Sequence, residues 1–150
     1  MQFYVKDIMS ENLITINQNA TIKELVSIFS DKGIIGVPVI DGDECVVGVV
    51  SSMDVMKNES SHDFYRSTSA NLFEHTSEET SNFLDRKVDT IMTKDLYTIS
   101  ADDTIAKMAK IMYEQKIHRL LVVDYNKLIG IVSTFDLLKL IATNDEEVII

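Results

Sequence analysis

The sequence has a single cysteine, no long apolar run and an excess of acidic over basic side chains. Because Cys45 is alone, an intrachain disulfide and a cysteine-based metal cluster are both excluded. The 14 Lys and Arg against 24 Asp and Glu give a net charge of −10, which argues against nucleic-acid or anionic-membrane partners, since phosphates would be repelled. No segment approaches the length of a membrane span, and no signal peptide is evident. We therefore expect a soluble, cytoplasmic protein.

Motifs of common catalytic and metal sites are also missing. The sequence has no GxxxxGK[ST] phosphate loop, and its three His have no metal-ligand spacing. Ser133, His118 and Asp136 could be arranged as a catalytic triad. However, nothing marks an oxyanion hole or a nucleophile turn, and a helix cap explains Ser133 and Asp136 better. We therefore predict no enzyme activity, no metal site and no required cofactor.

What the sequence does contain is one unit written twice. The segment 5–10 (VKDIMS) returns as 88–93 (VDTIMT), and 48–54 (GVVSSMD) returns as 130–136 (GIVSTFD). In the second pair of segments, each copy holds a Gly, two β-branched residues, a Ser and, three residues after that Ser, an Asp. This repetition predicts two equivalent sites.

Each copy is expected to fold in the order β-α-β-β-α. A short strand precedes a helix with one apolar face, and a hairpin leads to a final helix that starts near Asp54 or Asp136. The strands are predicted at 13–16, 36–40 and 46–50, and again at 96–99, 120–123 and 128–132. A unit of about 55 residues is too small to bury its sheet and helices alone. The expected fold is therefore an α+β protein of the α/β-sandwich type, with two tandem units related by a pseudo-two-fold axis. Methionines and aliphatic residues on the helices are expected to be mostly core.

Composition divides the chain further. We assign 1–57 to the first unit and 87–143 to the second. Residues 58–86, which are rich in Ser, Thr, Asn and Glu, are expected to form a connecting arm that is partly helical or mobile. Residues 144–150 are expected to form a solvated tail.

At this point the sequence resembles a known family, the CBS domain. The resemblance rests on the repeated Val-x-x-Ile-Met-[Ser/Thr], on Gly-Val-Pro-Val-Ile-Asp at 36–41 and on the Gly-x-Val-Ser-x-x-Asp endings, although Leu121 stands where the first copy has Pro38. It implies a stand-alone CBS pair, or Bateman module: a regulatory protein that senses AMP, ADP or ATP in clefts between the units and signals to a partner protein or a homodimer mate. The alternatives are an S-adenosylmethionine sensor and a ligand-free dimerisation or protein-interaction module.

The resemblance also implies roles for individual residues. Those expected to contact the ribose are Asp54 and Asp136, those expected to face sugar or phosphate with a hydroxyl are Ser51, Ser133 and Thr134, and those expected to line the adenine are Thr15, Ile16, Thr98 and Ile99. A Ser-x-x-Asp that opens a helix is also a capping box, in which the hydroxyl and the carboxylate bind free backbone N–H groups. A purely structural role for these residues therefore stays open.

A basic run distinguishes the second copy. Lys116, His118 and Arg119 lie in a stretch that resembles the phosphate-contacting strand of AMP-binding CBS pairs. The alternative is a solvated strand edge. These cations could serve a nucleotide whose ribose is held by Asp54 rather than by Asp136. The first copy lacks such residues, so its site could be empty or hold an uncharged adenosine group.

Overall fold

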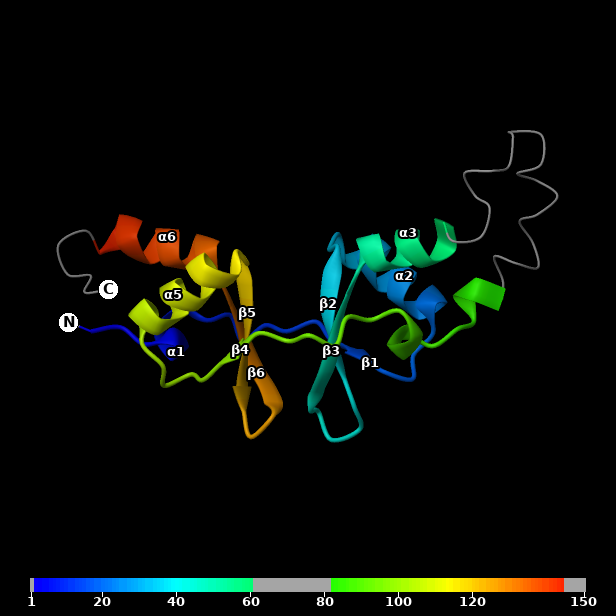
Figure 1. Ribbon diagram of the computed structural model, residues 1–150, viewed down its shortest axis with the longest axis horizontal. Coiled ribbons are helices and arrows are strands. Elements are labelled where there is room, and N and C mark those ends of the chain that lie inside the picture. Colours follow the sequence, from blue (N-terminus) through cyan, green and yellow to red (C-terminus); the bar gives the residue numbers. More distant parts are fainter. Residues whose placement is uncertain (1, 61–81, 145–150) are drawn as a thin grey trace. The chain divides into compact units, whose positions relative to one another are not determined.

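The computed structural model describes residues 2–60 and 82–144 (Figure 1). Most of the expected arm, 61–81, and the tail 145–150 lie outside the described residues. The elements of the first repeat are β1 (Ile16–Asn17), α2 (Ile22–Lys32), β2 (Gly36–Ile40), β3 (Val46–Ser51) and α3 (Ser52–Ser60). Those of the second repeat are β4 (Thr98–Ile99), α5 (Ile105–Gln115), β5 (Arg119–Asp124), β6 (Lys127–Ser133) and α6 (Thr134–Thr143). The predicted β-α-β-β-α order and the α+β class are confirmed.

Each repeat forms a three-stranded sheet with the same topology. The first strand pairs in parallel with the second, and the second pairs antiparallel with the third. The predicted strand 36–40 is confirmed, and the other hairpin strands extend one residue further at one or both ends. The first strands are shorter than predicted, because only Ile16 and Asn17, or Thr98 and Ile99, pair with the neighbouring strand. The final helices begin two residues earlier than expected.

Local hydrogen bonds set the helix ends. Thr21 and Glu24 form a capping box at the start of α2, with both hydrogen bonds at 3.2 Å. Ahead of α5, the Asp103 carboxylate accepts from the Ser100 N–H at 3.0 Å and pairs with Lys107 at 3.0 Å. Partial burial pushes the pKa of Asp103 up, but these two partners together hold it below its ordinary value.

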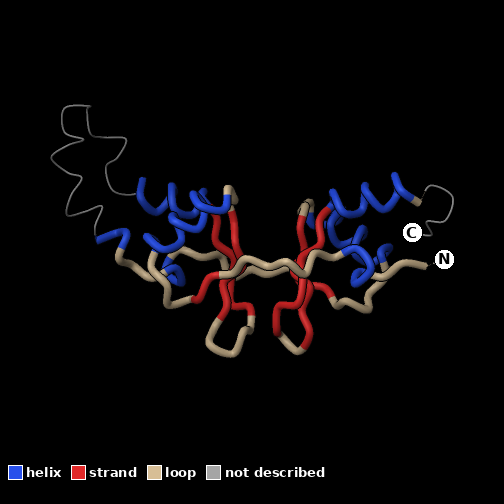
Figure 2. Tube along the Cα trace, turned by 180° about the vertical axis from the view of Figure 1, so that it is seen from behind, coloured by secondary structure: helices blue, strands red, loops and turns tan. Residues whose placement is uncertain are grey.

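The helices of each unit lie on one side of its sheet (Figure 2) and bury an apolar core against it. Met108 and Met112 of α5 are buried, as predicted. The prediction for helix methionines was wrong on α3, where Met53 is 59% and Met56 is 55% exposed. Because α3 buries Val55 but leaves these two side chains exposed, the helix also presents apolar surface to solvent.

The chain forms two compact units whose boundaries differ from those of the repeats. Ile14–Asp95 make one, the first-repeat unit, and Met1–Leu13 with Leu96–Ile150 make the other, the second-repeat unit. The short helix α1 (Val5–Ile8), which opens the first sequence repeat, therefore folds with the second-repeat unit; Figure 1 shows it beside α5. Conversely, the 3-10 helix η1 (Val88–Thr90) folds with the first repeat.

Residues 5–10 and 88–93, which we call the leader segments or leaders, are anchored by backbone hydrogen bonds. Ser10 exchanges two with Ile131 of β6, at 2.8 and 3.0 Å, and Thr93 exchanges two with Val49 of β3, at 2.8 and 2.9 Å. Each leader thus adds one residue to the outer edge of a sheet. In the described ranges, 2–60 and 82–144, no helix is both long and apolar enough to cross a membrane.

Candidate functional site

The start of α6 holds the first pair of predicted site residues. The Ser133 N–H donates to Asp136 Oδ2 at 2.8 Å, and the Ser133 hydroxyl donates to the same oxygen at 3.0 Å. In return, Asp136 N–H donates to the Ser133 hydroxyl at 3.2 Å. This is a complete capping box, so the structural role left open by the sequence is real.

The start of α3 repeats this arrangement. Ser51 N–H and hydroxyl donate to Asp54 Oδ2 at 2.8 and 3.1 Å, and Asp54 N–H donates to the Ser51 hydroxyl at 3.4 Å. Among the described residues, neither Asp54 nor Asp136 uses its other carboxylate oxygen, Oδ1, in a hydrogen bond. Both carboxylates are partly exposed. Capping therefore leaves one charged acceptor free in each unit, which suits a hydroxyl-bearing ligand.

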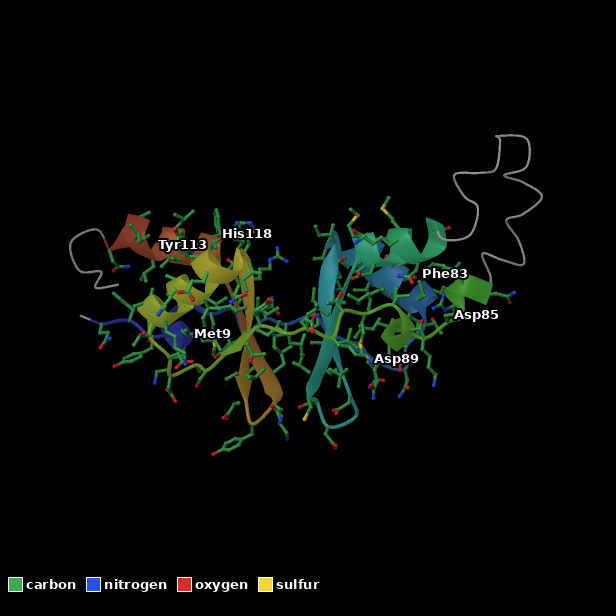
Figure 3. The ribbon with its side chains drawn as sticks, viewed as in Figure 1. Met9, Phe83, Asp85, Asp89, Tyr113 and His118 are labelled. Atoms are coloured by element: carbon green, nitrogen blue, oxygen red, sulfur yellow. The ribbon has the colours of Figure 1, made fainter. Side chains whose placement is uncertain are left out.

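The basic residues of the second repeat lie beside the start of α6. Arg119 is the cross-strand partner of Ser133, and the His118 carbonyl accepts from the Thr134 N–H at 2.9 Å. Lys116 ends α5 in the left-handed conformation, with φ 55°. Figure 3 shows His118 in the connection between α5 and β5. The structure therefore brings these residues and the Ser133–Asp136 cap to one end of the β5–β6 hairpin.

The three basic side chains are exposed and make no ion pair within the part of the chain that the structure describes. No neighbouring carboxylate pairs with them. A strand edge that is simply exposed to solvent would have the same geometry. With the helix N-terminus nearby, this corner of the second-repeat unit can attract an anion.

The residues expected to line the adenine divide by exposure. Ile16 and Ile99 are each 4% exposed and pack into the cores, so only their backbone is available to a ligand. Thr98 is exposed and Thr15 partly exposed. The residues directly before them, which were not singled out from the sequence, are large and exposed: Ile14 is 36% and Tyr97 is 44% exposed. The sequence already distinguished these two residues, because both are large and occupy equivalent positions of the repeat.

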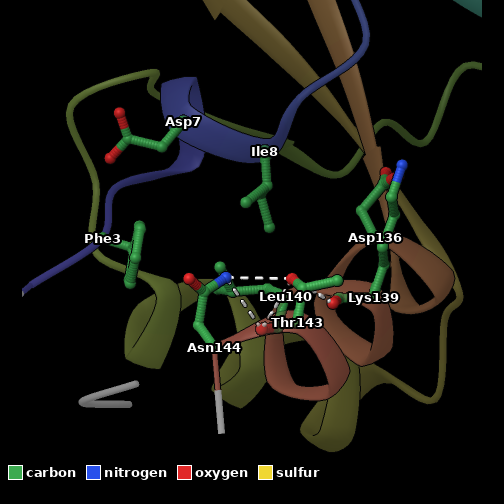
Figure 4. A pocket seen from close by; sticks show the side chains of 8 residues that line it. All are labelled: Phe3, Asp7, Ile8, Asp136, Lys139, Leu140, Thr143 and Asn144. Carbon is green, nitrogen blue, oxygen red and sulfur yellow. Dashed lines mark hydrogen bonds between the residues drawn. The ribbon is translucent and has the colours of Figure 1, made fainter. Parts of the chain in front are cut away.

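A cavity of about 310 Å³ along α6 was also missed (Figure 4). It lies between α1 and α6, and its lining includes Asp136, Lys139 and the apolar side chains of Phe3, Ile8 and Leu140. No sequence pattern could indicate it, because α1 comes from the other end of the chain.

The geometry gives little support to the triad arrangement. The Ser133 hydroxyl donates to the neighbouring carboxylate, and no hydrogen bond joins it to the His118 ring in the described part of the chain. The same ranges contain no group of three or more His, Cys, Asp or Glu side chains that could hold a metal ion.

Comparison with known proteins adds the following. The family model of the CBS domain matches residues 5–61 and 88–143. The uncharacterized protein MJ1232 of Methanocaldococcus jannaschii is 33% identical over 139 residues, which are 92% of this chain and 39% of the relative. Homoserine O-acetyltransferase of Methanococcus vannielii is 34% identical over 130 residues, which are 86% of this chain and 23% of the enzyme. The chain thus spans less than half the length of these curated relatives.

Among solved structures, the chain is similar to the CBS domain pair of protein MJ0100 in complex with 5′-methylthioadenosine and S-adenosyl-L-methionine. The identity is 25% and the TM-score 0.67, with 95% of this chain and 98% of that chain covered.

Proposed function

The chain belongs to the CBS domain family, and we propose that it is a regulatory module that binds an adenosine-containing ligand and passes its bound state to a partner protein or to a second copy. The observation that carries this proposal is the free Oδ1 of Asp54 and of Asp136, each held in place by a capping box. A ribose diol supplies donors for such an oxygen. The complex of the similar protein MJ0100 with two adenosine compounds supports this ligand class.

The proposed ligands are the adenine nucleotides AMP, ADP and ATP. Support comes from the basic side chains of Lys116, His118 and Arg119 beside the start of α6, which make no ion pair with any residue that the structure describes. In an acidic protein, these cations and the helix N-terminus can stabilise a phosphate through charge-assisted hydrogen bonds of about 1.5–3 kcal/mol each. The hydroxyls of Ser133 and Thr134 lie at the same corner. Thr98 and the backbone of Ile99 would contact the base.

Binding would act as a signal by shifting the population between two arrangements of the protein. A ligand shifts such an equilibrium only as far as its affinities for the two states differ. At about −0.3 kcal/mol per atom, the roughly 23 non-hydrogen atoms of AMP give about −7 kcal/mol, or a Kd near 10 µM. This level suits a sensor of a metabolite that varies in concentration.

Isothermal calorimetry with AMP, ATP, S-adenosylmethionine and adenosine tests the proposal. We expect AMP or ATP to bind, and Arg119→Ala to weaken AMP about tenfold while adenosine changes less than twofold. Lys127→Ala is the matched control, because Lys127 lies at the opposite end of the same hairpin, as the cross-strand partner of Asp124. Binding of S-adenosylmethionine alone would change the ligand class, and no binding at millimolar concentration would refute the sensor function.

A ligand-free interaction module is the second candidate, and exposed apolar side chains on α3 and α6 favour it. Met53, Met56, Phe135 and Leu138 are each more than half exposed. Met53 and Met56 give α3 an apolar face in the first-repeat unit, and Phe135 and Leu138 give α6 one in the second-repeat unit; we call these the α3 and α6 apolar faces. Such surfaces commonly mark an interface.

A further inference from the structure

We propose that the α3 apolar face of one copy of the chain packs antiparallel against the α6 apolar face of a second copy. The inference rests on the second candidate function, the interaction module, and goes beyond it by stating which surfaces meet and in which direction. It does not depend on ligand binding. It is carried by the residues that stand at the two ends of each face, in positions that the repeat makes equivalent.

The C-terminal ends of the two faces differ in chemistry. The two residues of each face are three positions apart, so they lie on the same side of their helix. The next position at that spacing is Glu59 on α3 and Ile141 on α6. Glu59 is partly exposed and makes no ion pair with any described residue, and Ile141 is exposed. The α3 face therefore ends in an acid, whereas the α6 face continues as an apolar stripe.

The helix starts differ in the opposite sense. At the first residue of α3, the Ser52 N–H donates to the carbonyl of Ile35, whose side chain is 70% exposed. At the equivalent place beside α6, the Thr134 N–H donates to the carbonyl of His118. His118 and the next residue, Arg119, are both exposed. Apolar surface therefore precedes the α3 face, and basic side chains precede the α6 face.

An antiparallel contact between α3 and α6 matches these ends. Glu59 of one copy then meets His118 and Arg119 of the other, which allows charge-assisted hydrogen bonds. At the opposite end Ile141 meets Ile35, and the two apolar faces lie between these ends. Both helices cover the same distance, because six residue steps from the first face residue to the last position make about 9 Å.

The other alignments lack this match. Antiparallel contacts between two α3 helices or two α6 helices, and a parallel contact between α3 and α6, each place a charged side chain on an isoleucine. Parallel contacts between like helices bring like charges together. Charge and apolar surface therefore favour the same alignment, the antiparallel contact of α3 with α6.

The middle of this contact is also complementary. Met56 lies opposite Phe135 of the other copy, and Met53 lies opposite Leu138. A methionine sulfur packs favourably against an aromatic ring, and the flexible methionine side chain fills irregular gaps. Each contact thus pairs the methionines of one helix with the larger Phe and Leu side chains of the other.

Rescue by a designed charge pair tests which faces meet. We expect Met56→Glu alone and Phe135→Lys alone each to weaken association about tenfold in sedimentation equilibrium, because each puts a charge opposite an apolar side chain. Combined in one chain, the two substitutions should give association about threefold tighter than either single variant, since Glu and Lys then face each other. Both positions are exposed, so neither substitution removes a core side chain.

The matched control is Met56→Glu with Tyr113→Lys. It has the same net charge as the rescue variant, but its Lys stands at an exposed position of α5, outside both faces. We expect this control to associate as weakly as Met56→Glu alone. Rescue by Tyr113→Lys would reveal a general effect of net charge and overturn the inference.

Thiol cross-linking provides an independent test, because Cys45 is the only cysteine and Cys45→Ser removes it. In that background, chains with Met56→Cys are mixed with chains with Phe135→Cys and treated with a short bismaleimide. We expect linked dimers in the mixture and none from either chain by itself. Linked dimers from one kind of chain alone would show that like faces meet.

The outcomes separate this inference from ligand binding. A double variant that associates more weakly than both single variants overturns the proposed contact. An unaltered protein that is monomeric at millimolar concentration also overturns it. In either case, binding of AMP in calorimetry would leave the sensor function standing, and absence of that binding would refute the sensor function alone.

Discussion

Gly48 and Gly130 sit at equivalent places in β3 and β6, where a leader methionine packs against the strand. A Cβ at Gly48 would lie 2.5 Å from Met92 Sδ and 3.0 Å from the Thr93 carbonyl oxygen. At Gly130 it would lie 2.7 Å from Met9 Sδ and 3.2 Å from the Ser10 carbonyl oxygen. The glycine and the Ile-Met-[Ser/Thr] motif therefore recur together because the methionine fills the space that the glycine leaves.

Substitution of these glycines should destabilise the protein through overpacking. We expect Gly48→Ala and Gly130→Ala each to lower the free energy of unfolding by about 1–3 kcal/mol, measured by urea denaturation. Gly48→Ala should cost more, because its backbone contact is closer. Gly42→Ala, which meets nothing within 4 Å, should change stability by less than about 0.5 kcal/mol.

The clash should be specific to the methionine. In Met9→Ala/Gly130→Ala the loss should be smaller than the sum of the two single losses, since removing the Met9 side chain relieves the contact. Strictly additive losses would contradict this account of the repeated motif.

At the scale of elements, α3 and α6 each have two surfaces with different tasks. One side packs on the sheet, and the first turn holds the capping carboxylate whose Oδ1 is free. Each helix also carries its own apolar face, with the exposed Met56 on α3 and the exposed Leu138 on α6 at equivalent places of the repeat. Ligand binding and assembly could therefore be altered separately.

The α3 and α6 apolar faces are expected to contact a second copy of the chain. Met56→Glu with Leu138→Glu should convert a dimer to a monomer in sedimentation equilibrium, because charged side chains would have to be buried in the interface. Tyr113→Glu, at an 85% exposed position on α5, is the control and should leave the dimer intact. If the unaltered protein is a monomer, or if the dimer persists with both Glu substitutions, these faces do not form a dimer interface.

At the scale of the whole molecule, the two compact units exchange their leaders. Val5 and Val88 are equivalent in the repeat, and both side chains have 0% exposure. Val5 packs in the core with residues of α5, β5 and β6, whereas Val88 packs with residues of α2, β2 and β3. The sheet and helices of each repeat therefore depend on the opening segment of the other repeat.

This exchange predicts which strands and helices a substitution in each core will destabilise. Val5→Ala should lower the free energy of unfolding by about 2 kcal/mol and raise hydrogen exchange in β5, β6 and α6, although residue 5 lies at the start of the first repeat. Val88→Ala should instead raise exchange in β2, β3 and α2. Hydrogen-exchange mass spectrometry on the two variants checks this, and increased exchange in the repeat that follows each valine would refute the exchange of leaders.

How much could be read from the sequence depended on how far apart the interacting residues are. The element order, the capping boxes at Thr21 and Ser133 and the CBS family were all determined by the sequence. These features follow from periodicity and from hydrogen bonds between residues a few positions apart. The ligand and the roles of Asp54, Asp136 and the basic run remain proposals.

Only the tertiary structure decided which repeat each leader joins. The two sheets offer similar glycine gaps, at Gly48 and Gly130, so local sequence does not distinguish between them. The cavity beside Asp136 and the exposure of Met53 and Met56 were also decided only by the tertiary structure. Each depends on which distant segments cover a helix, and that is set by the free energy of long-range packing rather than by neighbours in the chain.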